Sequence, residues 1–154
     1  MGEDCACGGG SEETIYAEQE PTFRTFTIPG RPIAQPRTRS RWDGQHYTKD
    51  NGVKGYKAHA AMLARQSGCT PAKGRVAMEL HFHFRRPPSH FTSKGALRKG
   101  APEFPGHGCG DTDNLTKAVK DALKGIAYAD DTQVCEEHVF KAWADDDCTV
   151  VRIW

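Results

Sequence analysis

The chain has 154 residues, which fits one domain that is large enough to bury a core without disulfide bonds. Its hydrophobic fraction of 37% is low for a compact domain, so part of the chain is predicted to be loop or tail. The six cysteines show neither a disulfide-framework spacing nor a zinc-binding one, and no secretory signal or long apolar stretch is apparent. We therefore expect reduced thiols, a cytoplasmic location and no membrane partner.

Charge is distributed unevenly along the chain. Residues 1–20 are rich in glycine and carry six of the 20 acidic residues but none of the 21 basic ones, so they are predicted to form a disordered acidic tail. The remaining residues, 21–154, then carry a net charge of +7 and are predicted to form the single folded domain. A basic domain of this kind favours a polyanionic partner such as nucleic acid.

The first predicted elements are a strand and a basic loop. Residues 22–28 alternate apolar and polar side chains, which is typical of a strand, and Pro29 follows. Residues 31–57 are strongly basic and include four aromatic or imidazole rings, a mixture that suits contacts with phosphates and sugars. The candidate DNA contacts in this loop are Arg37, Arg39, Arg41 and Lys54.

A helix and a strand follow. Apolar residues at helical spacing predict a helix over 53–66, ended by Gly68. Residues 75–84 alternate cleanly, which predicts a strand with an apolar face. Its other face carries Glu79, His81 and His83, which are expected to face solvent or a covering element more often than a ligand.

Residues 85–110 form a long segment rich in proline and glycine, with five basic residues and one acid. Loops of this length inside a domain are usually functional or disordered, and the charge favours an arm that faces nucleic acid. The candidate DNA contacts in the arm are Arg85, Arg86, Lys94, Arg98 and Lys99.

The last third of the chain predicts a helix and two strands. From Leu115 to Leu123 the apolar residues follow the spacing of a helix with one buried stripe, and Gly125 ends it. Residues 134–143 and 148–154 are predicted to be strands of an antiparallel hairpin. The expected fold class is α+β: a small mixed β-sheet with two main helices packed on one face and long basic loops.

Carboxylates concentrate around this last helix. Asp111 and Asp113 stand at its start, where free N–H groups and the helix dipole keep them ionised, and Asp130 and Asp131 follow its end. Such acids can hold a hard cation that neutralises a phosphate and activates water. This requires the chain to fold back along the helix so that the acids converge.

Lys117 lies one turn from the first acids, on one line with Asp113 and Asp121. It could steady the scissile phosphate or orient the attacking water. The alternative is an exposed ladder of ion pairs with little energetic value. Residues 145–147 are a rival acidic cluster, but a solvated turn is the better interpretation.

Two enzyme patterns fit poorly. In one class of phosphatase the D-x-D motif follows an apolar strand, whereas here it follows a loop, and no acid followed by Glu-x-Lys appears on a strand. A non-catalytic DNA-binding protein with a structural acidic cluster stays open, as do a metal-dependent phosphatase and a nuclease for other branched or single-stranded DNA.

The stretch from Gly110 to Val134 (GDTDNLTKAVKDALKGIAYADDTQV) resembles the signature of the RusA family of Holliday-junction resolvases, which is common in prophages. The family pattern is D-x-D-N-x-x-K, then D-A-L, then D-D-x-Q. The resemblance implies that Asp111, Asp113 and Asp131 bind metal and that Lys117 is essential. Asn114 and Gln133 then support the site, and Asp130 could assist. Many relatives have proline directly before the first aspartate, where this chain has Gly110, which predicts a less rigid approach.

The resemblance further implies a symmetric homodimer that binds a four-way DNA junction and nicks two strands of like polarity. The implied cofactor is Mg²⁺, for which Mn²⁺ could substitute, and no small-molecule cofactor is expected. A two-fold dimer would present two equivalent sites to a substrate with its own approximate two-fold axis. The implied role is in DNA recombination and repair.

Overall fold

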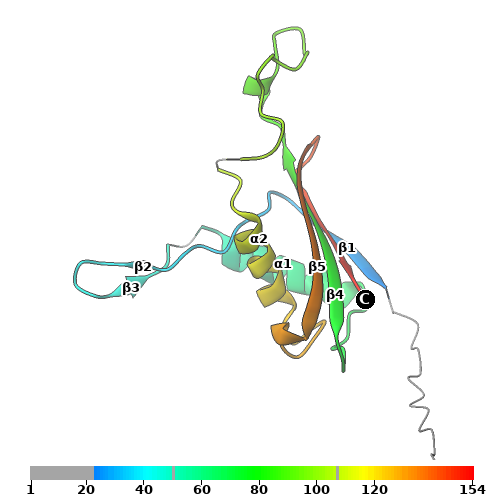
Figure 1. Cartoon of the computed structure of the whole chain (residues 1–154). Helices are drawn as coiled ribbons and strands as arrows, with labels where there is room; N and C mark the ends of the chain where they lie inside the picture. The colour runs from blue at the N-terminus through cyan, green and yellow to red at the C-terminus, as the bar shows by residue number, and fades with distance from the viewer. Residues whose placement is uncertain (1–22, 50, 107) are drawn as a thin grey trace, which may run out of the picture.

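The computed structural model describes residues 23–49, 51–106 and 108–154, so the predicted acidic tail over 1–20 lies outside the described residues. A mixed four-stranded sheet forms one layer, and both long helices pack on one of its faces (Figure 1). This arrangement confirms the predicted α+β fold class. The core lies between the sheet and the helices.

The sheet has the strand order β1-β6-β4-β5. Strand β4 pairs in parallel with β5 and antiparallel with β6, which in turn pairs antiparallel with β1. The apolar face of β4 is buried against the helices, as its alternation predicts. The bounds are β1 Arg24–Pro29, β4 Val76–Arg85, β5 Val134–Ala144 and β6 Cys148–Ile153.

The predicted hairpin of the last two strands is wrong, because β4 lies between β5 and β6. The turn at 145–147 instead crosses the end of β4, where the backbone N–H of Arg85 donates to the Asp147 carboxylate at 2.9 Å. β4 is the most apolar strand, so burial favours it inside the sheet, whereas β5 takes an exposed edge. In the acidic cluster at 145–147, the Asp147 carboxylate is thus bound to the backbone of β4, which fits the interpretation of this cluster as a turn.

The two helices are α1, Val53–Gln66, and α2, Thr112–Leu123. The bounds of α1 confirm the predicted 53–66. Two of its four buried residues are alanines, Ala60 and Ala64, whose small side chains allow close packing beside α2. The hydroxyl of Tyr56 on α1 shares a hydrogen bond of 2.7 Å with that of Thr149 on β6, and burial raises the pKa of Tyr56 to about 12.

Two basic arms project from the body (Figure 1). One is a small hairpin of β2, Arg39–Ser40, and β3, His46–Tyr47, so the predicted loop over 31–57 contains this hairpin and then runs into α1. The other arm covers 86–106 and includes the short helix η1, Pro88–His90. Both arms correspond to the segments that the sequence marks as basic.

The second face of the sheet has no described element packed on it. Glu79, His81 and His83 lie there, where the Glu79 carboxylate contacts His81 at 2.6 Å and Arg152 at 2.7 Å. The hydrogen bond from His81 lowers the pKa of Glu79. Glu79 therefore pairs with His81 on its own strand and with Arg152 on β6, and not with a helix. Across the described ranges, no helix combines the length and apolar character needed to cross a bilayer.

Candidate active site at the signature helix

Asp111 and Asp113 lie on two different sides of the start of α2. Asp111 is the N-cap residue, but its side chain makes no capping hydrogen bond; its carboxylate instead accepts one from the guanidinium of Arg37 at 3.2 Å. Asp113 lies in the first turn and lines another cavity. The helix start thus presents one acid to each of two cavities.

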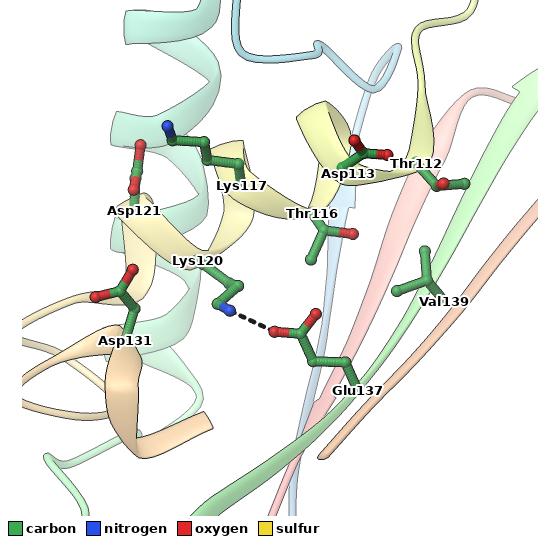
Figure 2. A pocket seen from close by; sticks show the side chains of 9 residues that line it. All are labelled: Thr112, Asp113, Thr116, Lys117, Lys120, Asp121, Asp131, Glu137 and Val139. Atoms are coloured by element: carbon green, nitrogen blue, oxygen red, sulfur yellow. Dashed lines mark hydrogen bonds and ion pairs between the residues drawn. The ribbon is translucent and has the colours of Figure 1, made fainter. Parts of the chain in front are cut away.

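The cavity on the Asp113 side, here called the aspartate cavity, has a volume of about 470 Å³. It runs along α2 toward β5 and the turn that follows the helix (Figure 2). It is lined by Thr112, Asp113, Thr116, Lys117, Lys120, Asp121, Asp131, Glu137 and Val139. It therefore contains three of the four predicted catalytic residues, and Asp111 lies outside it.

Lys117 and Asp113 make no ion pair within the described parts of the chain. The alternative of an ion-pair ladder is not what the structure shows, because Asp121 pairs with Lys57 of α1 at 2.8 Å. The other lysine of the cavity, Lys120, pairs with Glu137 of β5 (Figure 2). Lys117 and Asp113 are thus left available for a ligand, which an ion-pair ladder would not allow.

Asp131 enters the aspartate cavity from the far end of α2. The chain folds back after the helix, where Lys124 contacts Asp130 at 2.6 Å and Asp131 at 3.7 Å. Since a helix of 12 residues is about 18 Å long, Asp131 and Asp113 stand near opposite ends of the cavity. Among the described residues no three metal-ligating side chains form a group.

The donors nevertheless have the right chemistry for magnesium. Mg²⁺ prefers oxygen ligands and is usually held by one or two carboxylates together with substrate phosphates and water. Asp111, Asp113 and Asp131 supply carboxylate oxygens on or beside the cavity. A site that is completed only when DNA binds needs no preformed cage of three acids.

Asp130 has a structural role in the turn after the helix. Its carboxylate accepts a hydrogen bond from the Thr132 backbone N–H at 3.1 Å and forms an ion pair with Lys124. The Lys124 ammonium and then the Thr132 hydrogen bonds hold the pKa of Asp130 well below its usual range. Asp130 therefore stays charged, and its carboxylate is already bound to Lys124 and to the Thr132 backbone.

Gln133 fixes the same turn through four hydrogen bonds. Its carbonyl oxygen accepts from the N–H groups of Ala129 and Asp130, and its amide nitrogen donates to the carbonyls of Ala72 and Gly74, all within 3.1 Å. The glutamine of the D-D-x-Q motif thus ties the aspartate turn to the segment before β4. This explains physically why the motif contains an amide at that position.

We expect Gln133→Ala to lower the free energy of unfolding by about 2 to 3 kcal/mol, because it leaves several backbone groups without partners. Urea unfolding followed by circular dichroism measures the effect. Gln45→Ala, in the turn between β2 and β3, is the control. It also removes a glutamine side chain, but the side-chain amide of Gln45 makes no described hydrogen bond, so stability should change by less than about 0.5 kcal/mol. Equal stability of the two variants would contradict the bracing role.

On the Asp111 side lies a second cavity of about 640 Å³, here called the basic cavity. Its cationic lining comes from four residues on two segments: Arg37, Arg39 and Lys49 around the β2–β3 hairpin, and Lys141 on β5. Arg37 and Arg39 are predicted DNA contacts, and Asn114 of the signature also lines the cavity. Lys49 and Lys141 are not among the predicted contacts. A signal for Lys141 exists in the sequence, because alternation along β5 places it on the same side of the strand as Val139, which lines the aspartate cavity.

The other predicted DNA contacts divide into exposed and anchored residues. The guanidinium groups of Arg86 and Arg98 donate to the carbonyls of Pro102 and Phe91, so both hold the 86–106 arm together. Arg41 stacks on Tyr47 with 5.2 Å between its Cζ and the ring centre. The remaining four are exposed: Lys54, Arg85, Lys94 and Lys99.

Gly110 is held tightly, which contradicts the expectation of a relaxed approach to Asp111. Its φ of +81° is unavailable to proline, and a Cβ there would lie 2.7 Å from the Cβ of Ala34. Its carbonyl accepts a hydrogen bond of 2.9 Å from Lys141. Packing against the loop at Ala34 replaces the stiffness that a proline ring would give.

We expect Gly110→Ala to lower the free energy of unfolding by about 2 to 4 kcal/mol, since it combines backbone strain with a steric overlap. Gly108→Ala is the matched control, because Gly108 has a φ of +83° but open space around its Cβ position. The control should cost only about 1 to 2 kcal/mol. Thermal or urea unfolding measures the stability of both variants. A larger loss of stability in Gly108→Ala than in Gly110→Ala would show that the contact with Ala34 is unimportant.

Comparison with known proteins agrees with this geometry. The family described as "Endodeoxyribonuclease RusA" matches residues 29–154, which include both arms, both cavities and three of the four strands of the sheet, together with only the last residue of β1. The chain is also 32% identical over 139 residues to "Uncharacterized protein YqaN" of Bacillus subtilis (strain 168), covering 83% of this chain and 93% of that protein. The chain therefore belongs to the RusA family of endodeoxyribonucleases.

Proposed function

We propose that the protein is a metal-dependent endonuclease that resolves four-way DNA junctions during recombination and repair. The main support is the pair of Asp113 and Lys117, which face the aspartate cavity without an ion pair in the described chain, on the signature helix of a RusA-family protein. Both side chains are exposed, and an exposed ion pair is worth little, so they can stay unpaired in the free protein at small cost. A DNA phosphate could pair with Lys117, and a metal ion that neutralises the phosphate could bind Asp113.

The acids that would hold Mg²⁺ at the start of α2 are Asp113 and Asp111, whereas Asp131 offers a separate carboxylate at the far end of the aspartate cavity; Mn²⁺ would fit the same oxygen donors. When bound, the ion would neutralise charge on the scissile phosphate and lower the pKa of a coordinated water. The part of Lys117 is to place its ammonium against a phosphate oxygen, where it offsets the charge that develops in the transition state. Lys120 is occupied by Glu137 and keeps β5 against α2.

Arg37 couples DNA binding to the release of Asp111. The Arg37–Asp111 pair is exposed on both sides, with 75% and 68% of the two side chains accessible, so it is worth less than about 1 kcal/mol. A DNA phosphate is a bidentate partner for arginine and can replace the carboxylate. We propose that Arg37 moves to the phosphate and frees Asp111 for the metal.

The basic arms and a second copy of the chain would provide recognition of the junction. The arms at 39–47 and 86–106 project from the body in different directions (Figure 1), which would let them contact separate DNA branches. We propose a two-fold homodimer, because two equivalent cavities then face a substrate with its own two-fold axis. Binding through phosphates should weaken steeply as salt rises.

Cleavage of a labelled synthetic four-way junction tests the proposal against a matched linear duplex, with magnesium, manganese or EDTA. We expect paired nicks near the branch point with either metal and none with EDTA or on the duplex. Binding measured in EDTA supplies the second readout. If the protein binds the junction but cuts no branched DNA with any divalent ion, the non-catalytic DNA-binding function is correct. If it cuts other branched DNA in preference to junctions, the protein is an endonuclease with a different substrate.

A further inference from the structure

The basic cavity carries an exposed aromatic ring at its edge. Phe104 lines the cavity and is 68% exposed. Burying a phenyl ring is worth about 2 kcal/mol, so a ligand that enters the basic cavity could gain affinity by covering this ring. The cavity volume of about 640 Å³ lies within the range of about 300 to 1,000 Å³ that is common for small-ligand sites.

The segment that carries Phe104 is anchored on both sides of the ring. On one side, the Pro102 carbonyl accepts hydrogen bonds from the guanidinium of Arg86 at 2.9 Å and from the indole N–H of Trp143 at 3.0 Å. On the other side, Pro105 is buried. The ring between them is thus presented by a fixed backbone, which lowers the entropy cost of stacking on it.

The polar groups of the cavity complement a nucleotide. The cations Arg37, Arg39 and Lys49 suit its phosphate, and all three come from the segment that leads through the β2–β3 hairpin. Gln35 also lines the cavity, and its side-chain oxygen is buried with no hydrogen-bond partner among the described residues. A buried acceptor of this kind needs a donor, such as the amino group of a base.

We propose that the basic cavity binds one unpaired nucleotide of the DNA, with its base stacked on Phe104 and its phosphate held by the arginines. This inference rests on the proposed function only in taking DNA as the ligand. In a paired duplex both faces of each base are covered by neighbours, so stacking on Phe104 requires a base that has left the helix. At a branch point such bases are available, and the cavity would therefore favour branched over linear DNA.

The position of the cavity gives this nucleotide a role in placing the cut. Asp111 lines the basic cavity while Asp113, two residues later, lines the aspartate cavity. A nucleotide held against Phe104 would lie on one side of the helix start, with the neighbouring phosphate directed toward the other. Phe104 is thus a positioning residue for the scissile strand.

The test measures binding in EDTA, so that its result is independent of cleavage. The probes are a linear duplex, the same duplex with one unpaired nucleotide, and the same with one unpaired abasic residue, which keeps the phosphate but lacks the base. Stacking of one base on an aromatic ring is worth about 1 to 3 kcal/mol, or about 5- to 150-fold in affinity. We expect wild type to bind the unpaired nucleotide about tenfold more tightly than either control DNA.

Phe104→Ala should lose this tenfold preference and bind the duplex as wild type does, whereas Phe104→Tyr should retain the preference. Leu97→Ala is the matched control, because Leu97 is an apolar side chain of the same arm, 53% exposed, that does not line the cavity. It should bind all three DNAs as wild type does. An unchanged preference in Phe104→Ala, or an equal loss on all three DNAs, overturns the proposal. Failure of junction cleavage with the preference intact would count against the proposed nuclease function alone.

Discussion

Asp113→Asn will reduce cleavage of the four-way junction by about 10³-fold while junction affinity in EDTA stays within a factor of about two. The substitution preserves size but removes the one carboxylate that faces the aspartate cavity at the start of α2. Several kcal/mol of transition-state stabilisation depend on a metal held by such an acid. Single-turnover cleavage with saturating protein gives the rate, and a gel-shift titration gives the affinity.

Asp145→Asn is the control for Asp113→Asn, since it removes the same charge at the acidic turn between β5 and β6. Cleavage should then remain at the wild-type rate. A loss in Asp145→Asn equal to that in Asp113→Asn would place the metal at the rival turn. Full activity of Asp113→Asn would rule out the aspartate cavity as the site of the chemistry.

The second large effect is expected at Lys117, where Lys117→Met should slow cleavage by about 10²-fold with little change in stability. Methionine keeps most of the aliphatic stem but removes the ammonium, which makes no ion pair in the described chain and so supports no described structure. Loss of a charge that acts in the transition state lowers the cleavage rate more than substrate affinity. Rates at saturating and at limiting protein separate these two effects.

Lys120→Met provides the matched comparison on the same helix and cavity. Lys120 is bonded to Glu137 of β5, so its loss removes a contact between α2 and β5 and should lower stability slightly more than Lys117→Met does. Its effect on the cleavage rate of folded protein should be the smaller of the two. The reverse ranking, with Lys120→Met the slower enzyme, would assign the catalytic cation to Lys120.

Local patterns in the sequence predicted most of the elements that surround the site. Periodicity of 3.6 residues predicted both helices, because each has an apolar stripe that must face the sheet. Alternation predicted β4 for the same reason. The resemblance to the family signature implied Asp111, Asp113, Asp131 and Lys117 as one group; the structure places the last three on one cavity and Asp111 on another.

Other features depend on contacts between distant segments and left no local pattern. The insertion of β4 between β5 and β6 could not be read from the short turn that joins them, since a turn of that length is also typical of a hairpin. Lys141 reaches the basic cavity and the Gly110 carbonyl only because β5 is an edge strand beside α2. The contact of Asp111 with Arg37, 74 residues away in the chain, likewise left no local pattern.

The sequence by itself determined the fold class, both helices, the central strand and the family signature, because these depend on spacing within short segments. Only the tertiary structure decided which acids share a cavity, which cations are already paired and where Phe104 stands. Those properties arise from packing between segments that are far apart in the chain, where burial and charge pairing select one arrangement among several that the local patterns allow. The acids around the signature helix therefore belong to two cavities, with Asp113 and Asp131 on one and Asp111 on the other.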